Sequence, residues 1–246
     1  MACHFQADLG GKMKKILFLF LTLSVACCAV WAGDVASFVD KGFTEDGKYY
    51  IFGQYGKTDK KFQGWAEIYQ VDIAANDYVD GGVFKTNPSV VTAGKNGKEV
   101  YEALEAKNFS YLKNIPAKKA NMDHVLYILD DVNKTGTDEI VFSDFRGSDV
   151  ENRNTYHIQL IPTFYNSGKK LSSSFYIMLE KKDSSGNVIT RQKIGSPDIK
   201  RRGVTNYKIE KIMCDDSEKN LIFVIEKTME DDTGVSIRYM VEAVQF

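Results

Sequence analysis

The sequence predicts a mainly β fold of antiparallel meanders, with one helix inserted around residues 97–113. From residue 33 onward, short runs rich in Val, Ile, Tyr and Phe alternate with polar residues in steps of two, as half-buried strands do. Clusters of Gly, Asn, Asp and Ser separate these runs. We expect about a dozen strands, too few for a regular ring of four-stranded blades, so they would form either propeller-like blades or a β-sandwich.

Length and composition fit a globular protein with its own core. The chain has 246 residues, of which 43% are hydrophobic and 26% are charged, and its formal net charge is −1. Such a composition does not predict disorder. Because the chain has no large basic field, no nucleic acid is expected as a partner. We expect residues 33–246 to form a single β-rich domain with the helix as an insertion.

The N-terminal segment indicates export. Lys14 and Lys15 precede an apolar run of about fifteen residues, which ends in the V-W-A pattern of a cleavage site. Residues 13–32 are therefore predicted to be a signal peptide that starts at Met13, and residues 1–12 are interpreted as a start-site artefact. The apolar run is shorter than the roughly 20 residues that a membrane-spanning helix needs, so no transmembrane span is expected in the mature chain. Removing residues 1–32 takes away three lysines and one aspartate, so the net charge changes from −1 to −3.

A lipid anchor is the alternative to soluble export. The segment L-S-V-A-C, which ends at Cys27, loosely resembles a lipobox, in which the cysteine is acylated, and Cys28 follows directly. Soluble export would make the protein secreted or periplasmic, and acylation would make it an envelope lipoprotein. Cleavage after residue 32 leaves Cys214 as the only cysteine, so the mature chain forms no internal disulfide. We expect Cys214 to be buried at a strand end.

The expected strands fall before and after the helix. Those before it surround the turn at Asp46-Gly47, and their apolar residues Phe43, Tyr50, Phe52, Ile68 and Val71 should lie in the core. The helix places Val100, Ala103, Leu104 and Leu112 near helical spacing and stops before Pro116. The strands are predicted at 34–40, 49–54, 65–73, 78–79, 82–84, 124–129, 139–145, 156–164, 174–180, 188–193, 207–213, 221–226 and 235–244.

Two resemblances bear on the fold. Residues 42–73, with F-T-E-D-G-K-Y-Y-I-F and A-E-I-Y-Q-V-D-I, resemble one blade of a TolB-like propeller, with Thr44 and Glu45 in place of the usual serine and proline. The segments G-D-V-A-S-F-V-D, F-G-Q-Y-G and Y-M-V-E are similar to bacterial predicted secreted proteins, domain-of-unknown-function family 2259. The second resemblance implies export and a shared fold, but no activity and no functional residues.

The sharpest local motif is D-V-N-K-T-G-T-D-E-I-V at residues 131–141. Side-chain oxygens fall at positions one, three, five and nine, and a carbonyl falls at position seven, as in calcium-binding loops. We therefore predict a Ca²⁺ site formed by Asp131, Asn133, Thr135, Thr137 and Glu139. The alternative is a hairpin loop without an ion, because N-K-T-G between two strands turns the chain unaided.

No catalytic motif accompanies these features. The sequence contains no G-x-S-x-G, H-E-x-x-H, P-loop or dinucleotide-binding glycine pattern. His124 and His157 have no second ligand at zinc-like spacing, so we expect hydrogen-bonded strand histidines. The densest basic cluster, I-K-R-R-G at residues 199–203, fits a solvated loop or a contact to an anionic polymer, lipid headgroups or an acidic partner.

These observations predict an exported envelope protein that binds a partner and does not catalyse a reaction. The expected partner is an envelope protein or a glycan. Two alternatives remain. One is an envelope polysaccharide hydrolase that uses carboxylates on the loops, and the other is a surface protein anchored by a lipid at Cys27 or Cys28.

Overall fold

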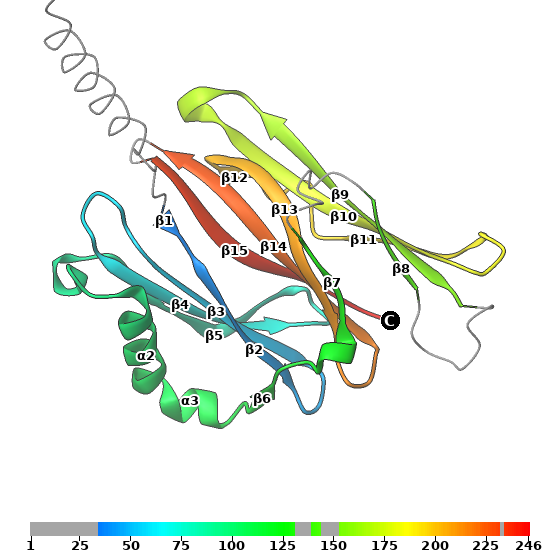
Figure 1. Ribbon diagram of the computed structural model, residues 1–246, viewed down its shortest axis with the longest axis horizontal. Helices are drawn as coiled ribbons and strands as arrows, with labels where there is room; N and C mark the ends of the chain where they lie inside the picture. Colours follow the sequence, from blue (N-terminus) through cyan, green and yellow to red (C-terminus); the bar gives the residue numbers. More distant parts are fainter. Residues whose placement is uncertain (1–33, 131–138, 144–152, 232–233) are drawn as a thin grey trace, which may run out of the picture. The chain divides into compact units, whose positions relative to one another are not determined.

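The described strands build three sheets of five strands each. The computed structural model describes residues 34–130, 139–143, 153–231 and 234–246. We call the sheets the N-terminal sheet, the central sheet and the outer sheet, and Figure 1 shows the central sheet lying between the other two. The mainly β class is thus confirmed. The predicted start-site artefact at residues 1–12 and the signal peptide at residues 13–32 lie outside the described residues.

The N-terminal sheet is a meander of consecutive strands with one short strand added at its edge. Its order is β5-β4-β3-β2-β6. A glycine at position 47, with φ of 66°, closes the first hairpin at the expected turn. The strands are β2 (Ser37–Thr44), β3 (Tyr49–Lys57), β4 (Gly64–Asp72), β5 (Asp77–Thr86) and β6 (Ala117–Lys118).

The central sheet joins the two ends of the described chain. Its order is β1-β15-β14-β13-β7, and only the pair β1 and β15 is parallel. The three long neighbouring strands are antiparallel hairpin partners. The strands are β1 (Asp34–Val35), β7 (Val125–Ile128), β13 (Val204–Cys214), β14 (Asn220–Asp231) and β15 (Gly234–Gln245).

The outer sheet covers one face of the central sheet. Its order is β11-β10-β9-β8, with β12 paired to the start of β10. The strands are β8 (Ile140–Ser143), β9 (Thr155–Tyr165), β10 (Ser172–Lys182), β11 (Val188–Ile194) and β12 (Arg201–Arg202). Short 3₁₀ helices lie at Val90–Thr92, Met122–His124 and Gly168–Lys170.

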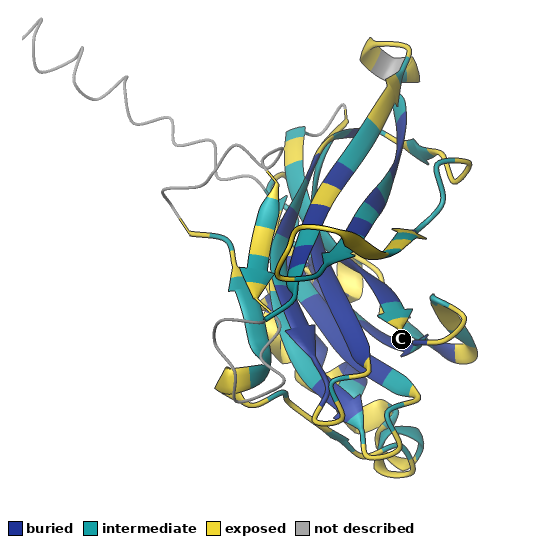
Figure 2. Ribbon diagram, turned by 90° about the vertical axis from the view of Figure 1, so that its right-hand side faces the viewer, coloured by how far each residue is buried: buried dark blue, intermediate teal, exposed yellow. Residues whose placement is uncertain are grey.

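The core lies on both faces of β14. Phe223 and Ile225 pack against the outer sheet, whereas Ile222 and Val224 pack against the N-terminal sheet. All four side chains are fully buried, because alternate residues of a strand point to opposite faces and both faces are covered here. Figure 2 shows this layer as the most continuously buried part of the described chain.

Two helices cover the other face of the N-terminal sheet: α2 (Gly97–Lys107) and α3 (Phe109–Lys113). Asn96 caps α2 by accepting a hydrogen bond from the backbone of Lys98. The helix predicted around residues 97–113 is confirmed, with a break at Asn108, and Val100 and Leu104 pack on the sheet. Ala103, expected on the same face, is exposed. Tyr101 is buried in its place.

Several predictions made from the sequence can be compared directly with the structure. All five predicted core residues of the first strands are at most 6% exposed: Phe43, Tyr50, Phe52, Ile68 and Val71. Cys214 is fully buried at the last position of β13, as expected. The blade resemblance of residues 42–73 is not confirmed as a propeller. These residues form the first three strands of the N-terminal sheet, which stacks on the central sheet.

Candidate functional site

The predicted calcium loop lies mostly outside the described residues. Asp131, Asn133, Thr135 and Thr137 are not described, and only Glu139 can be placed. Its exposed carboxylate lies 3.0 Å from Nδ1 of His157 on β9. In the described part of the chain, no three His, Cys, Asp or Glu side chains form a group that could hold a metal ion. The calcium site stays a prediction.

Both expected structural histidines have hydrogen-bonding neighbours. Nε2 of His157 lies 3.1 Å from the hydroxyl of Thr155, in addition to its contact with Glu139. Nδ1 of His124 lies 3.1 Å from Oδ1 of Asp216. His157 lies in β9 as expected, whereas His124 ends a 3₁₀ helix just before β7.

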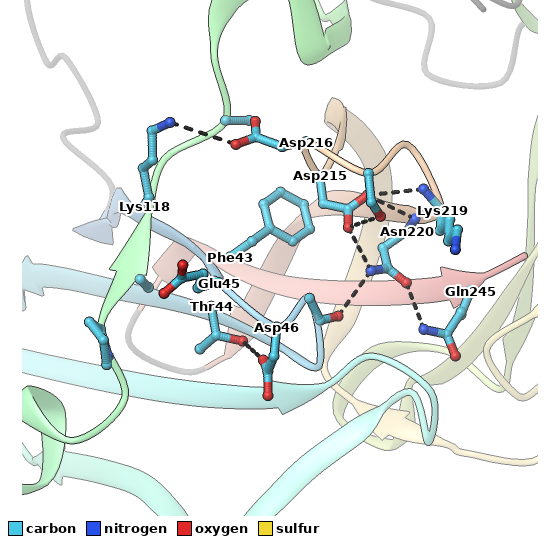
Figure 3. A pocket seen from close by; sticks show the side chains of 15 residues that line it. Phe43, Thr44, Glu45, Asp46, Lys118, Asp215, Asp216, Lys219, Asn220 and Gln245 are labelled. Atoms are coloured by element: carbon cyan, nitrogen blue, oxygen red, sulfur yellow. Dashed lines mark hydrogen bonds and ion pairs between the residues drawn. The ribbon is translucent and has the colours of Figure 1, made fainter.

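A large cavity lies where the β2–β3 turn meets the β13–β14 turn, and we call it the turn cavity (Figure 3). Its volume is about 890 Å³. Several charged side chains reach it, among them Glu45, Asp46, Asp215 and Asp216, with Lys118 opposite. Such a cluster of carboxylates is where a hydrolase or a cation site would be sought first.

Two carboxylates of the turn cavity, those of Asp46 and Asp215, are already engaged in holding the two turns. Asp215 is 4% exposed and accepts hydrogen bonds from the backbone of Lys219 and Asn220, at 3.0 and 3.1 Å. Asp46 accepts from the hydroxyl of Thr44 at 2.7 Å, and Asp216 pairs with Lys118 at 3.6 Å. These contacts explain the cluster as turn architecture, because short polar side chains bond to nearby backbone in tight turns.

A second cavity lies beside β15, and we call it the basic cavity. It has a volume of about 540 Å³, within the range of small-ligand sites. All three sheets contribute to it: β4 and β5 of the N-terminal sheet, β13, β14 and β15 of the central sheet, and β12 with its preceding loop from the outer sheet. Strands that are far apart in sequence therefore meet around one space.

Four cationic side chains line the basic cavity: Lys85, Arg201, Arg202 and Lys227. Lys85 pairs with Glu67 at 3.2 Å. Arg201 lies over the ring of Phe175, and its guanidinium is 3.7 Å from the carboxylate of Glu242, a loose ion pair. Only Asp77 and Glu242 contribute acidic groups to the lining. Positive charge therefore exceeds negative charge in this space.

Lys227 has no acidic partner in the basic cavity. Among the described residues, no carboxylate forms an ion pair with its amine. Burial and the nearby cations of Arg201, Arg238 and Lys85 lower the pKa of Lys227 to about 8, while Glu67 acts in the opposite direction. A half-buried cation without a close counter-ion is unfavourable, and a bound anion would relieve this.

The acidic end of the basic cavity is fixed by the β4–β5 turn. Asn76, at a φ of 51°, donates from Nδ2 to Glu242 at 2.6 Å and accepts at Oδ1 from the backbone N–H of Ala243 at 2.6 Å. Burial raises the pKa of the Glu242 carboxyl, against the effects of Asn76 and Arg201. Gly195 leaves room for this carboxylate, because a Cβ there would lie 3.2 Å from it.

Aromatic rings form the wall of the basic cavity on the N-terminal sheet. The rings of Tyr69 and Tyr78 lie 4.9 Å apart, and Tyr69 also stacks on Phe52. The hydroxyl of Tyr69 donates to Glu67 at 2.6 Å, and burial raises its pKa far above the ordinary value. At neutral pH this wall is therefore uncharged and rigid.

Sequence reasoning found one part of this site. The cluster at residues 199–203 contains Arg201, which is placed in the cavity with a side chain 17% exposed, not in a solvated loop, while Arg202 is exposed. Lys227 and Glu242 were missed, since their positions relative to Arg201 depend on strand pairing. The sequence contains one signal for Lys227. This residue comes just after the uninterrupted apolar run of residues 221–225, and a charge so close to a buried run is half-buried.

A known protein family matches most of the chain. No curated protein and no solved structure matches it. In the described residues, no helix is both long and apolar enough to cross a membrane. A family described as predicted secreted protein (DUF2259) matches residues 51–245, which include all the strands that line the basic cavity. The chain therefore belongs to the DUF2259 family of predicted secreted proteins.

Proposed function

We propose that the protein is an exported binding protein of the periplasm or cell surface, with no catalytic role, and that it binds a small anionic group in the basic cavity. The supporting observation is the Lys227 amine, which shares this cavity with Arg201 and Lys85 and has no carboxylate partner among the described residues. The family description supports export.

The arrangement suits binding because the cations are held before a ligand arrives. Arg201 is fixed between Phe175 and Glu242, and it also donates to the carbonyl of Ile199 at 3.2 Å. Lys227 projects from the central sheet, where both neighbouring strands are paired with β14. Little side-chain entropy is then lost when an anion binds between them.

Titration calorimetry with inorganic phosphate, sulfate, citrate and glucuronate tests this proposal on the purified protein. At least one of these anions should bind, and Lys227→Met should weaken that binding at least about tenfold, the loss of one charge-assisted contact. Affinity should be higher at pH 7 than at pH 9.5, because only the protonated amine attracts the anion.

Lys98→Met is the matched control, since Lys98 is an exposed lysine on α2. Its anion binding should equal that of the wild type. The proposal is wrong if none of the four anions binds at millimolar concentration, or if Lys227→Met binds them as the wild type does.

The hydrolase alternative has its own readout. Release of reducing sugar from an envelope polysaccharide, abolished by Asp46→Asn or Asp215→Asn, would replace the binding proposal. We do not expect it, because a glycosidase needs two carboxylates facing its substrate, and Asp46 and Asp215 hold their own turns.

The N-terminal residue of the purified protein distinguishes soluble export from a lipid anchor. We propose cleavage after residue 32 and soluble export, so mass spectrometry should find Gly33 as the first residue. An acylated Cys27 or Cys28 at the N-terminus would instead establish the lipoprotein.

A further inference from the structure

The outward edge of β15 is open over half its length. On one side β15 pairs with β14 from Gly234 to Gln245. On the other side β1 pairs with Ser236 and Ile237 only, and the N–H of Ala36 donates to the carbonyl of Ile237 at 3.1 Å. In the described chain, no strand pairs with this edge beyond Ile237.

Two side-chain amides close parts of this edge. Gln54 accepts from the N–H of Tyr239 at 2.8 Å and donates to its carbonyl at 3.2 Å, so one carboxamide replaces a neighbouring strand. Asn76 accepts from the N–H of Ala243 at 2.6 Å. Both contacts protect an edge that would otherwise invite pairing with another chain.

Between these two amides lies Val241. In an antiparallel pair the backbone groups of alternate residues point the same way, so the N–H and carbonyl of Val241 face outward like those of Tyr239. Among the described residues, nothing donates to or accepts from these two groups. Val241 is only 5% exposed and lines the basic cavity. A buried backbone pair of this kind requires a partner.

The basic cavity continues along the same edge as a second hollow, which we call the edge groove. Its volume is about 600 Å³, and Ala243, Val244 and Gln245 line it. The two spaces share Asn76 and Asp77 from one side and Ser196 and Ile199 from the other, so they are contiguous. Together they follow β15 from Met240 to Gln245, a length of roughly 17–20 Å for six strand residues.

We propose that the basic cavity and the edge groove bind a short extended peptide with a free carboxylate. Its backbone adds to β15 by pairing with the N–H and carbonyl of Val241, as in β-strand addition. Its carboxylate lies against Lys227, which has no ion-pair partner among the described residues, and against Arg201, whose ion pair with Glu242 is loose at 3.7 Å. This inference rests on the proposed function and names the class of its anionic ligand.

The cavity walls fit such a ligand. Tyr69 and Tyr78 on one side and Ile199 and Met229 on the other can contact side chains that project to either face of an added strand. Asn76 marks the point where the ligand passes from the basic cavity into the edge groove. Its amide is held there by its bonds to Glu242 and Ala243.

The test uses a library of N-acetylated tetrapeptides with free carboxylates and the same library with C-terminal amides. The best carboxylate peptide should bind at least tenfold more tightly than its amide, and this ratio should fall several-fold in Lys227→Met, where only Arg201 remains to bind the carboxylate. Methylation of each peptide nitrogen in turn should cost at least tenfold at one position, where the N–H donates to Val241.

The outcomes separate this inference from the proposed function. If phosphate or citrate binds and no peptide does, or if no single N-methylation weakens binding, the peptide inference is wrong and the anion site stands. If a peptide binds equally well as its amide, the carboxylate assignment is wrong. If neither the four anions nor the peptides bind, both proposals fall.

Discussion

Lys227 makes the stability of this protein depend on pH in an unusual direction. Its amine is protonated less readily in the folded chain, with a pKa of about 8, than in the unfolded chain, where the ordinary value is 10.5. Below pH 8 both states carry the proton, and the folded state bears the cost of the buried charge. Between these two pKa values the unfolded state binds more protons, so the stability attributable to this residue rises with pH.

The Lys227→Met variant is expected to have a larger free energy of unfolding than the wild type at pH 7. The difference between the two free energies should be smaller by about 2 kcal/mol at pH 10. Urea unfolding at the two pH values measures it. Lys98→Met, at an exposed site, should show no such narrowing. A difference that stays constant with pH would contradict the lowered pKa.

At the scale of elements, glycines let α2 approach the N-terminal sheet. A Cβ at Gly53 would lie 2.4 Å from the ring of Tyr101, and a Cβ at Gly97 would lie 2.5 Å from the carbonyl oxygen of Gly56. The segment F-G-Q-Y-G therefore has a physical explanation: Gly53 leaves room for the helix, Gly56 leaves room for the ring of Trp65, and Gln54 between them closes the edge of β15.

Gly53→Ala should destabilise the protein by about 2 kcal/mol, the cost of an overpacked contact. Part of this loss should be recovered in Gly53→Ala with Tyr101→Leu, because the shorter side chain leaves room for the new methyl group. Thermal unfolding of the single and double variants gives the coupling energy. If the changes in the free energy of unfolding are strictly additive, the contact between residue 53 and Tyr101 does not determine how α2 packs on the sheet.

The segment between β7 and β8 carries the calcium prediction. Calcium in excess should raise the melting temperature of the wild type through binding to the folded state, and Asp131→Ala should remove this rise. Asp183→Ala is the matched control, because Asp183 holds an ordinary turn by accepting from the backbone of Ser185 and Asn187. Equal melting temperatures of the wild type in calcium and in chelator would rule the site out.

For the whole molecule, the central sheet is the structural link between the layers. Phe223 packs toward the outer sheet, while Trp65, the only tryptophan among the described residues, lies in the N-terminal sheet. If the three sheets unfold as one unit, a cavity at Phe223 lowers the free energy of unfolding of all of them. A probe in the N-terminal sheet, such as Trp65, then reports the same loss as a probe of the whole chain.

Phe223→Ala is expected to destabilise the protein by about 3–5 kcal/mol, since the side chain is fully buried. Tryptophan fluorescence and far-UV circular dichroism should shift together to lower urea concentration. An unchanged fluorescence transition alongside a shifted dichroism transition would mean that the N-terminal sheet unfolds separately.

The strands and the helix could be predicted from local pattern, because period-two alternation and turn residues act over a few positions. The pattern predicts residues 221–226 of the twelve-residue β14 and residues 207–213 of the eleven-residue β13, and both strands extend beyond these ends. The basic cavity could not be predicted. Arg201, Lys227 and Glu242 come together only through the pairing of β12 with β10 and of β14 with β15.

Burial of both faces of β14 requires an apolar sequence, and this sequence also affects the chain before it folds. A strand buried on both sides has no polar face, and L-I-F-V-I within it carries no charge, no proline and strong β propensity. In an unfolded chain such a segment readily associates with copies of itself. The Glu218-Lys219 pair before it and the Glu226-Lys227 pair after it are its nearest charged neighbours, and they act as gatekeepers. The strand that joins the layers of the folded molecule is therefore also the segment most prone to self-association until both flanking sheets have formed.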